Sequence, residues 1–283
     1  MTQINAKRYI DTQIYPIHQT GTAPYEALVA NIQGQLDEVG CAVLSGFIKR
    51  DQIAEFISEA DRVADKGHRS FNRTNVYFSE DDESLPPEHP ARRFYDRSNA
   101  FVPADNFGED SPLRSIYEWP AFMPFIQHAL SENEFYRYAD PLADVIINVV
   151  EQGDGFPWHF DTNNYTVTLA IQNGDRGGLF EYSPNLRAPG NENYDAVQAI
   201  LDGDTSTVHT LELMPGDLQI FKGRYSLHRV SPVSGKKRRY VGIFSFVDQP
   251  SMVAKVERAK QLYGRALPIH YEFENKRSDT LKD

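Results

Sequence analysis

The stretch FPWHFDTNNYTVTLAIQ, residues 156–172, carries two patterns on which the reading of the whole chain depends. Positions 166, 168 and 170 are polar or small, whereas 167, 169 and 171 are aliphatic, and this alternation predicts a half-buried β-strand. Earlier in the stretch, His159 and Asp161 stand two residues apart, just after the turn at 153–155. On an extended segment their side chains point the same way. The stretch therefore predicts a strand beside two potential metal ligands.

Further strand-like runs, each bounded by turn residues, follow from residue 141 onward. They cover residues 143–151, 177–182, 207–213, 216–221, 226–230 and 239–247. Roughly eight short strands with turns between them predict a jelly roll, the double-stranded β-helix that cupins share.

The first half of the chain has a different texture. Apolar residues recur at helical spacing over 24–39 and 51–65, and residues 112–139 predict short helices broken at Pro120 and Pro124. Residues 66–110 are polar and predict an irregular lid, while 253–263 predict a closing helix. We therefore expect an α+β fold in one domain, 1–283. Its parts are a mainly helical support and lid (1–140), a jelly-roll core (141–250) and a C-terminal helix and tail (251–283).

Composition excludes several classes of protein. The 283 residues are 40% hydrophobic and 24% charged, which is ordinary for a globular chain. A net charge of −11 argues against nucleic-acid binding and is compatible with small cationic or zwitterionic substrates. The single Cys41 allows no internal disulfide, and neither a leader nor a membrane-length apolar run is evident. These features predict a cytoplasmic protein.

A third potential ligand, His228, follows His159 by 69 residues on a separate predicted strand. A jelly roll can bring those two strands face to face. Two imidazoles and one carboxylate can occupy one face of a divalent metal and leave the opposite face open, which is the ligand set of non-haem Fe(II) oxygenases. Read alone, His159 is as well explained as an ordinary histidine at a strand end. The ordered set of three favours a metal site.

A basic run after the second histidine offers an anchor for a carboxylate. Arg238 lies ten residues beyond His228, and its permanently charged guanidinium can hold a carboxylate through two hydrogen bonds. Arg239 points to the opposite face of the same predicted strand, so one of the two must face the barrel interior. Lys236 and Lys237 fit a solvated turn.

The motifs His159-Phe160-Asp161, Pro215-Gly216-Asp217-Leu218 and His228-Arg229-Val230-Ser231-Pro232-Val233 together resemble the Fe(II)/2-oxoglutarate-dependent dioxygenases over residues 143–247. The segments 180–187 and 221–228 resemble, more narrowly, a bacterial branch of free amino acid hydroxylases and related free-lysine halogenases. Halogenases of that branch replace the carboxylate ligand by Gly or Ala to admit chloride. Because Asp161 is intact, the resemblance implies hydroxylation.

The resemblance also implies roles for single residues. His159, Asp161 and His228 would be the catalytic iron ligands, with Fe(II), 2-oxoglutarate and O2 as cofactors, and Arg238 would hold the distal carboxylate of 2-oxoglutarate. Relatives often carry Ser two residues after that arginine, and Tyr240 at this position leaves the choice between Arg238 and Arg239 open.

Other contacts are expected from residue type and position alone. Asn148 is a further candidate for the 2-oxoglutarate site, although a buried structural amide is an equal reading. Arg93 and Arg97, in the polar lid, are candidates for binding a substrate carboxylate, although surface arginines are commoner. Thr162, beside Asp161, is a candidate for contacting the substrate or supporting the metal ligand, or a simple turn former.

Three functions remain open at this point. The first is hydroxylation of an unactivated C–H bond in a free amino acid or similar small metabolite, with release of succinate and CO2. The second is hydroxylation of a protein side chain or a carrier-bound residue. The third is a jelly-roll metal-binding or sensor protein without turnover. The expected partner is a small molecule, with neither nucleic acid nor membrane, and the closing helix allows a homodimer.

Overall fold

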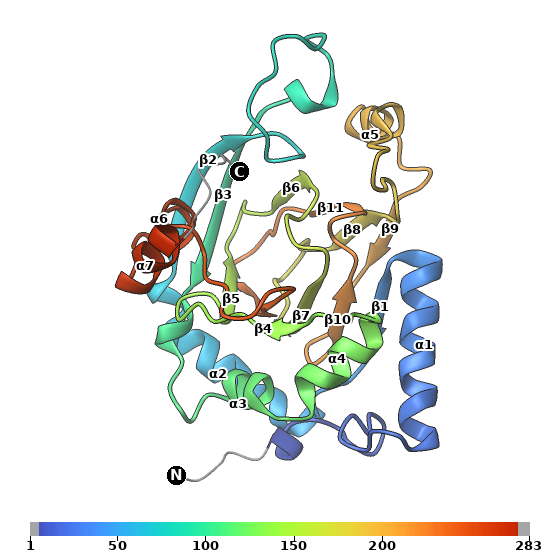
Figure 1. Ribbon diagram of the computed structural model, residues 1–283, viewed down its shortest axis with the longest axis vertical. Coiled ribbons are helices and arrows are strands. Elements are labelled where there is room, and N and C mark those ends of the chain that lie inside the picture. Colours follow the sequence, from blue (N-terminus) through green and yellow to red (C-terminus); the bar gives the residue numbers. More distant parts are fainter. Residues whose placement is uncertain (1–5, 277–283) are drawn as a thin grey trace.

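The computed structural model describes residues 6–276, and two facing β-sheets form its centre (Figure 1). The larger sheet has seven strands in the spatial order β1 (Cys41–Leu44), β10 (Leu218–Phe221), β7 (Thr166–Gln172), β12 (Arg239–Phe244), β5 (Val145–Val150), β3 (Tyr95–Val102) and β2 (His68–Thr74). The smaller sheet has the order β6 (Phe156–His159), β11 (Leu227–Val230), β8 (Phe180–Ser183) and β9 (His209–Leu211). A short pair joins β4 (Tyr136–Arg137) to β13 (Phe246–Val247). All these pairings are antiparallel, and the expected jelly-roll core is confirmed.

Four helices cover the outer face of the larger sheet: α1 (Ala23–Val39), α2 (Ile53–Val63), α3 (Pro112–Glu118) and α4 (Phe122–Leu130). Helix α1 ends at Gly40, whose φ of 65° is in the left-handed region that glycine adopts without strain. Pro124 was expected to break a helix, but it does not. It sits in the first turn of α4, where its missing N–H would have no partner in any case.

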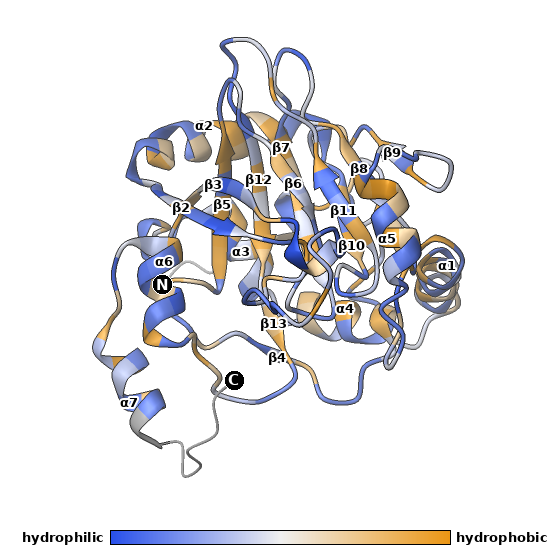
Figure 2. Ribbon diagram, turned by 90° about the horizontal axis from the view of Figure 1, so that it is seen from above, coloured by the Kyte–Doolittle hydropathy of each residue, from blue (hydrophilic) through white to orange (hydrophobic). Residues whose placement is uncertain are grey.

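The larger sheet has the hydrophobic core on its helix-covered face and the cavity on its other face, between the two sheets. In β7, Val167, Leu169 and Ile171 join the main hydrophobic core against the helices, while Thr166 and Thr168 face the space between the sheets. The alternation expected from the sequence is therefore confirmed. In Figure 2 hydrophobic residues are concentrated in the central strands, whereas the loops around the rim are mostly hydrophilic.

The expectation of an irregular segment over residues 66–110 was wrong in two parts of it. β2 and β3 form a hairpin that pairs with β5 and extends the larger sheet. β2 is the edge strand of the sheet and β3 is its inner neighbour, and polar residues of both strands line a cavity. The rest of the segment, namely the connection between them, which includes Glu80 to Glu83, and residues 103–110, is irregular apart from the short 3-10 helices Pro90–Arg92 and Ala104–Asn106.

Three helices remain: α5 (Tyr194–Leu201), α6 (Val256–Tyr263) and α7 (Pro268–Lys276). The expected closing helix corresponds to α6, which packs on β2 and β3, and α7 follows it. The end of the expected tail, 277–283, lies outside the described residues. Between residues 6 and 276, every helix is too short or too polar to cross a bilayer.

Candidate metal centre and its cavity

Three side chains converge where the two sheets open. His159 ends β6 and pairs in register with His228 on the neighbouring strand β11, and Asp161 follows two residues after His159. One potential ligand atom from each residue lies within 4.8 Å of the other two. Both histidines are 5% exposed. The structure thus brings together the three residues that the sequence singled out.

Backbone carbonyls orient the two imidazole rings. His159 Nδ1 lies 2.8 Å from the Pro157 carbonyl, and His228 Nδ1 lies 3.0 Å from the Ser226 carbonyl. A carbonyl oxygen only accepts, so each Nδ1 carries the proton and each Nε2 presents a lone pair. The two Nε2 atoms lie 3.5 and 3.4 Å from Asp161 Oδ1. Their lone pairs and the carboxylate are therefore directed at one shared point.

The electrostatics keep this set in its metal-binding form. Burial and the neighbouring His228 lower the pKa of His159 to about 4, so that ring is neutral at physiological pH. Burial acts to raise the pKa of Asp161, but the two histidines together hold it well below its usual value. A metal binds a neutral imidazole and an ionised carboxylate, so His159 and Asp161 are already in their metal-binding forms.

A hydroxyl and a glycine hold the carboxylate in place. Thr166 Oγ1 donates to Asp161 Oδ2 at 2.5 Å, and the Asp161 N–H donates to the Gly223 carbonyl at 3.0 Å. A Cβ at residue 223 would stand 2.0 Å from Asp161 Oδ2, so only glycine fits. Neither supporting residue was expected from the sequence, which pointed instead to Thr162. That residue accepts a hydrogen bond from Arg224 through its carbonyl and lines the cavity.

The donor set fits a divalent transition metal. Two imidazole nitrogens and one carboxylate oxygen on one side, with a cavity on the other, form the facial arrangement of non-haem Fe(II) enzymes. The adjoining cavity has a volume of about 750 Å³ and is lined largely by apolar residues, among them Phe78, Phe156 and Ile243. It leaves room for small molecules next to the metal position.

Of the neighbouring residues Arg238 and Arg239, the one that enters this cavity is not the one favoured by the resemblance. Arg239 is 7% exposed and lines the cavity, and among residues 6–276 no carboxylate pairs with it. Arg238 points the other way, to Asp65 and Glu151 at 2.9 Å each, so its expected place in the cavity was wrong. Gly178 makes room for the arginine, because a Cβ there would stand 2.8 Å from Arg239 Cδ.

Uncharged polar side chains also line the cavity. Asn148 is one of them, and its side-chain N–H donates to the Ala100 carbonyl at 3.1 Å. Thr168 and Gln219 also line it and bond to each other at 3.1 Å. Val241 stands two residues beyond Arg239 and offers no hydroxyl at that position.

Of the two arginines expected near the substrate, only one lines the cavity. Arg97 lines the cavity, and its guanidinium lies over the rings of Phe78 at 4.7 Å and Phe156 at 5.2 Å. Arg93 instead bonds Asp202 at 2.5 Å and does not line the cavity, so the structure does not bring this candidate to the substrate side. Lys255 and Arg258 also line the cavity. The sequence did not single out either of these cationic residues.

Comparison with known proteins agrees with this arrangement. The family model of halogenase D matches residues 25–263. No curated protein matches the sequence. Among solved structures, the chain is similar to an oxidoreductase of the 2OG-Fe(II) oxygenase family from Burkholderia pseudomallei, with 12% identity, a TM-score of 0.50, and coverage of 78% of this chain and 91% of that one.

Two further solved structures share the fold. The non-haem α-ketoglutarate-dependent epimerase SnoN of nogalamycin biosynthesis has 14% identity and a TM-score of 0.53, over 79% of this chain and 84% of that one. AviO1 from Streptomyces viridochromogenes Tue57 has 17% identity and a TM-score of 0.52, over 80% of this chain and 97% of that one. At these identities the likeness concerns the fold.

Proposed function

Since this chain belongs to the halogenase D family and has the fold of Fe(II)/2-oxoglutarate oxygenases, we propose that it hydroxylates an unactivated C–H bond of a free amino acid or similar small polar metabolite. The observation that carries the proposal is the position of Asp161. Its Oδ1 lies within 3.5 Å of both imidazole Nε2 atoms. The third ligand position, which a halide would need, therefore belongs to the protein.

Each side chain then has a distinct task. His159, Asp161 and His228 hold Fe(II), which together with 2-oxoglutarate and O2 supplies the oxidising chemistry, with release of succinate and CO2. Arg239 binds the distal carboxylate of 2-oxoglutarate through its guanidinium fork. Burial lowers the pKa of Arg239 to about 10, so it still carries its charge at neutral pH. A buried cation without a carboxylate partner among the described residues is costly unless an anion joins it.

The substrate side follows from the same cavity. Arg97 has its guanidinium fixed by two aromatic faces, which hold it in position but leave its charge intact. We propose that it binds the substrate carboxylate, with Thr162 beside it in the lining. Asn148, Thr168 and Gln219 are placed to hold the co-substrate. A homodimer and a cytoplasmic location stay predictions of the sequence.

The test compares the two neighbouring arginines. Protein loaded with Fe(II) without oxygen is mixed with 2-oxoglutarate, O2 and a panel of free amino acids, and succinate and product mass are measured. Arg239→Gln is expected to raise the KM for 2-oxoglutarate by about 10-fold to 100-fold, the cost of one charged hydrogen-bonded contact. Arg238→Gln, at the surface, should leave that KM within about twofold.

The outcomes separate the candidate functions. Substrate-stimulated succinate together with an oxygenated amino acid supports the proposal. Stimulation by peptides or carrier-bound residues alone would replace it with the second function. Absence of 2-oxoglutarate binding in metal-loaded protein would refute the oxygenase and leave a metal-binding jelly roll.

A further inference from the structure

The cavity beside the metal ligands carries an excess of positive side chains. Four cations line it: Arg97, Arg239, Lys255 and Arg258. Among the described residues, Asp161 is the one carboxylate that lines it. A divalent metal and the 2-oxoglutarate dianion cancel each other, so the substrate would meet the guanidinium groups of Arg97 and Arg258. This predominance of cations in the lining contrasts with the net charge of −11 of the whole chain.

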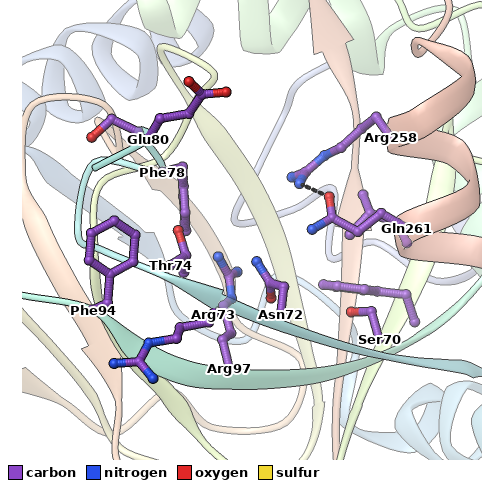
Figure 3. Close-up of a pocket in the computed structure, with 13 residues that line it drawn as sticks. Ser70, Asn72, Arg73, Thr74, Phe78, Glu80, Phe94, Arg97, Arg258 and Gln261 are labelled. Atoms are coloured by element: carbon purple, nitrogen blue, oxygen red, sulfur yellow. Dashed lines mark hydrogen bonds between the residues drawn. The ribbon is translucent and has the colours of Figure 1, made fainter. Parts of the chain in front are cut away.

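Two of these cations approach each other from different elements. Arg97 rises from β3, and Arg258 projects from α6 toward the same space (Figure 3). Both also line a second cavity of about 420 Å³ between β2, β3 and α6, whose lining adds Arg73 and one acid, Glu80. Burial and the charge of Arg258 contribute to lowering the pKa of Arg97, which falls to about 10. Like charges brought together in this way are stabilised when an anion binds between them.

The contacts that fix Arg258 do not neutralise it. Its Nη1 donates to Gln261 Oε1 at 2.9 Å, within the same helix, as the dashed line in Figure 3 shows. An amide acceptor orients a guanidinium without cancelling its charge. A planar guanidinium matches the two oxygens of a carboxylate, so Arg97 and Arg258 together can hold two separate acidic groups or one group bidentately.

We propose that Arg258 is a specificity-determining residue for a second acidic group, so that the substrate is a small amino acid with an acidic side chain rather than a basic or neutral one. The inference rests on the proposed function and deepens it. Arg97 would take one carboxylate of the substrate and Arg258 the other. The second acidic group of the substrate would be a carboxylate, because its plane and its two oxygens match the guanidinium of Arg258.

The acidic residues that a basic substrate would need as partners line a different cavity. Glu132, Glu134 and Asp248 line a separate cavity of about 200 Å³ on the far side of Thr162, together with Arg224. A basic side chain would have to reach these acids past Thr162 and Asn163, which both cavities share. The four cations, in contrast, line the metal-containing cavity itself, which favours the acidic substrate.

The test measures binding and turnover side by side. Fe(II)-loaded protein with 2-oxoglutarate is titrated without oxygen against glutamate, glutamine, aspartate, asparagine, lysine and phosphoserine, by calorimetry. Succinate release is then followed after O2 is added. We expect an acidic amino acid to bind at least about 10-fold more tightly than its amide, since each charged contact contributes a factor of that order.

Variants assign the effect to one side chain. Arg258→Gln should remove the preference for acid over amide, and Arg258→Glu should reverse it in favour of lysine. The matched control is Lys260→Gln on the same helix, whose ammonium lies near the ring of Tyr271 and lines neither cavity. It should leave every affinity within about twofold.

Each outcome decides the matter. Lysine or an amide bound as tightly as the acids, or an acid preference that survives Arg258→Gln, overturns the inference while turnover keeps the proposed function intact. Binding of phosphoserine without the carboxylates overturns the commitment to a carboxylate. No binding by any member of the panel also counts against the inference, and lost 2-oxoglutarate binding identifies failure of the proposed function instead.

Discussion

Gly223→Ala is the substitution that should damage the metal centre most specifically. The added Cβ would stand 2.0 Å from Asp161 Oδ2 and 2.7 Å from its Cγ. Ordinary contact begins near 3.5 Å, so the carboxylate would have to retreat by about 1.5 Å. The carboxylate would lose the 2.5 Å hydrogen bond from Thr166 and would no longer lie beside the two Nε2 atoms. Errors of about 1 Å cost roughly 100-fold in well-ordered sites, so metal affinity should fall by at least about that factor.

The assay is Co(II) and Fe(II) binding by calorimetry and by the Co(II) visible spectrum, with urea unfolding of the metal-free protein alongside. The matched control is Gly34→Ala, the same change on the exposed face of α1, where an added Cβ meets nothing within 4 Å. That change should stabilise the helix by up to about 1 kcal/mol and leave metal binding alone. Wild-type metal affinity in Gly223→Ala would refute the geometry proposed for Asp161.

Two further predictions concern stability. Burial raises the pKa of Glu59, which is 4% exposed, and Ser111, Leu113 and Arg62 offset this only in part. The folded state therefore binds the proton more tightly than the unfolded chain, and stability is lost as pH rises above about 4.3. Glu59→Gln should gain on the order of 1 kcal/mol at pH 7 and almost nothing at pH 4, measured by urea unfolding; an equal gain at both would contradict the assignment. His270→Ala removes a fully buried partner 3.0 Å from Asp140 Oδ2, so the free energy of unfolding should fall by about 3 kcal/mol, and an unchanged urea midpoint would contradict it.

The metal ligands could be predicted because their chemistry is local in the sequence. His159 and Asp161 need only an extended segment to point the same way, and His228 needs only a second strand beside the first. The β7 strand was equally accessible, since its aliphatic face meets the helices while its threonines meet the cavity. Both predictions rest on a period of two along a strand.

The choice between Arg238 and Arg239 could not be made from that period. β12 is buried on both faces: Tyr240 and Phe244 join the core, while Val241 and Ile243 line the cavity. An apolar run of this kind shows no alternation, and the register of β12 against β7 also shifts between Tyr240 and Val241. Ser245 confirms the direction, because it lies on the cavity side with Arg239.

The cationic lining escaped prediction for a different reason. Lys255 and Arg258 lie nearly a hundred residues after the first metal ligand, at the N-cap and in the first turn of α6, and nothing in their spacing distinguishes them from Lys260 on the same helix. Only the packing of α6 on β2 and β3 brings Arg258 to Arg97. The net charge of −11 also gave no guide to the cavity, because it is a sum over the whole chain. It was compatible with cationic or zwitterionic substrates. A bound substrate responds to the field inside the cavity, where low-dielectric walls strengthen each charge, and the described residues that line it include four cations and one carboxylate.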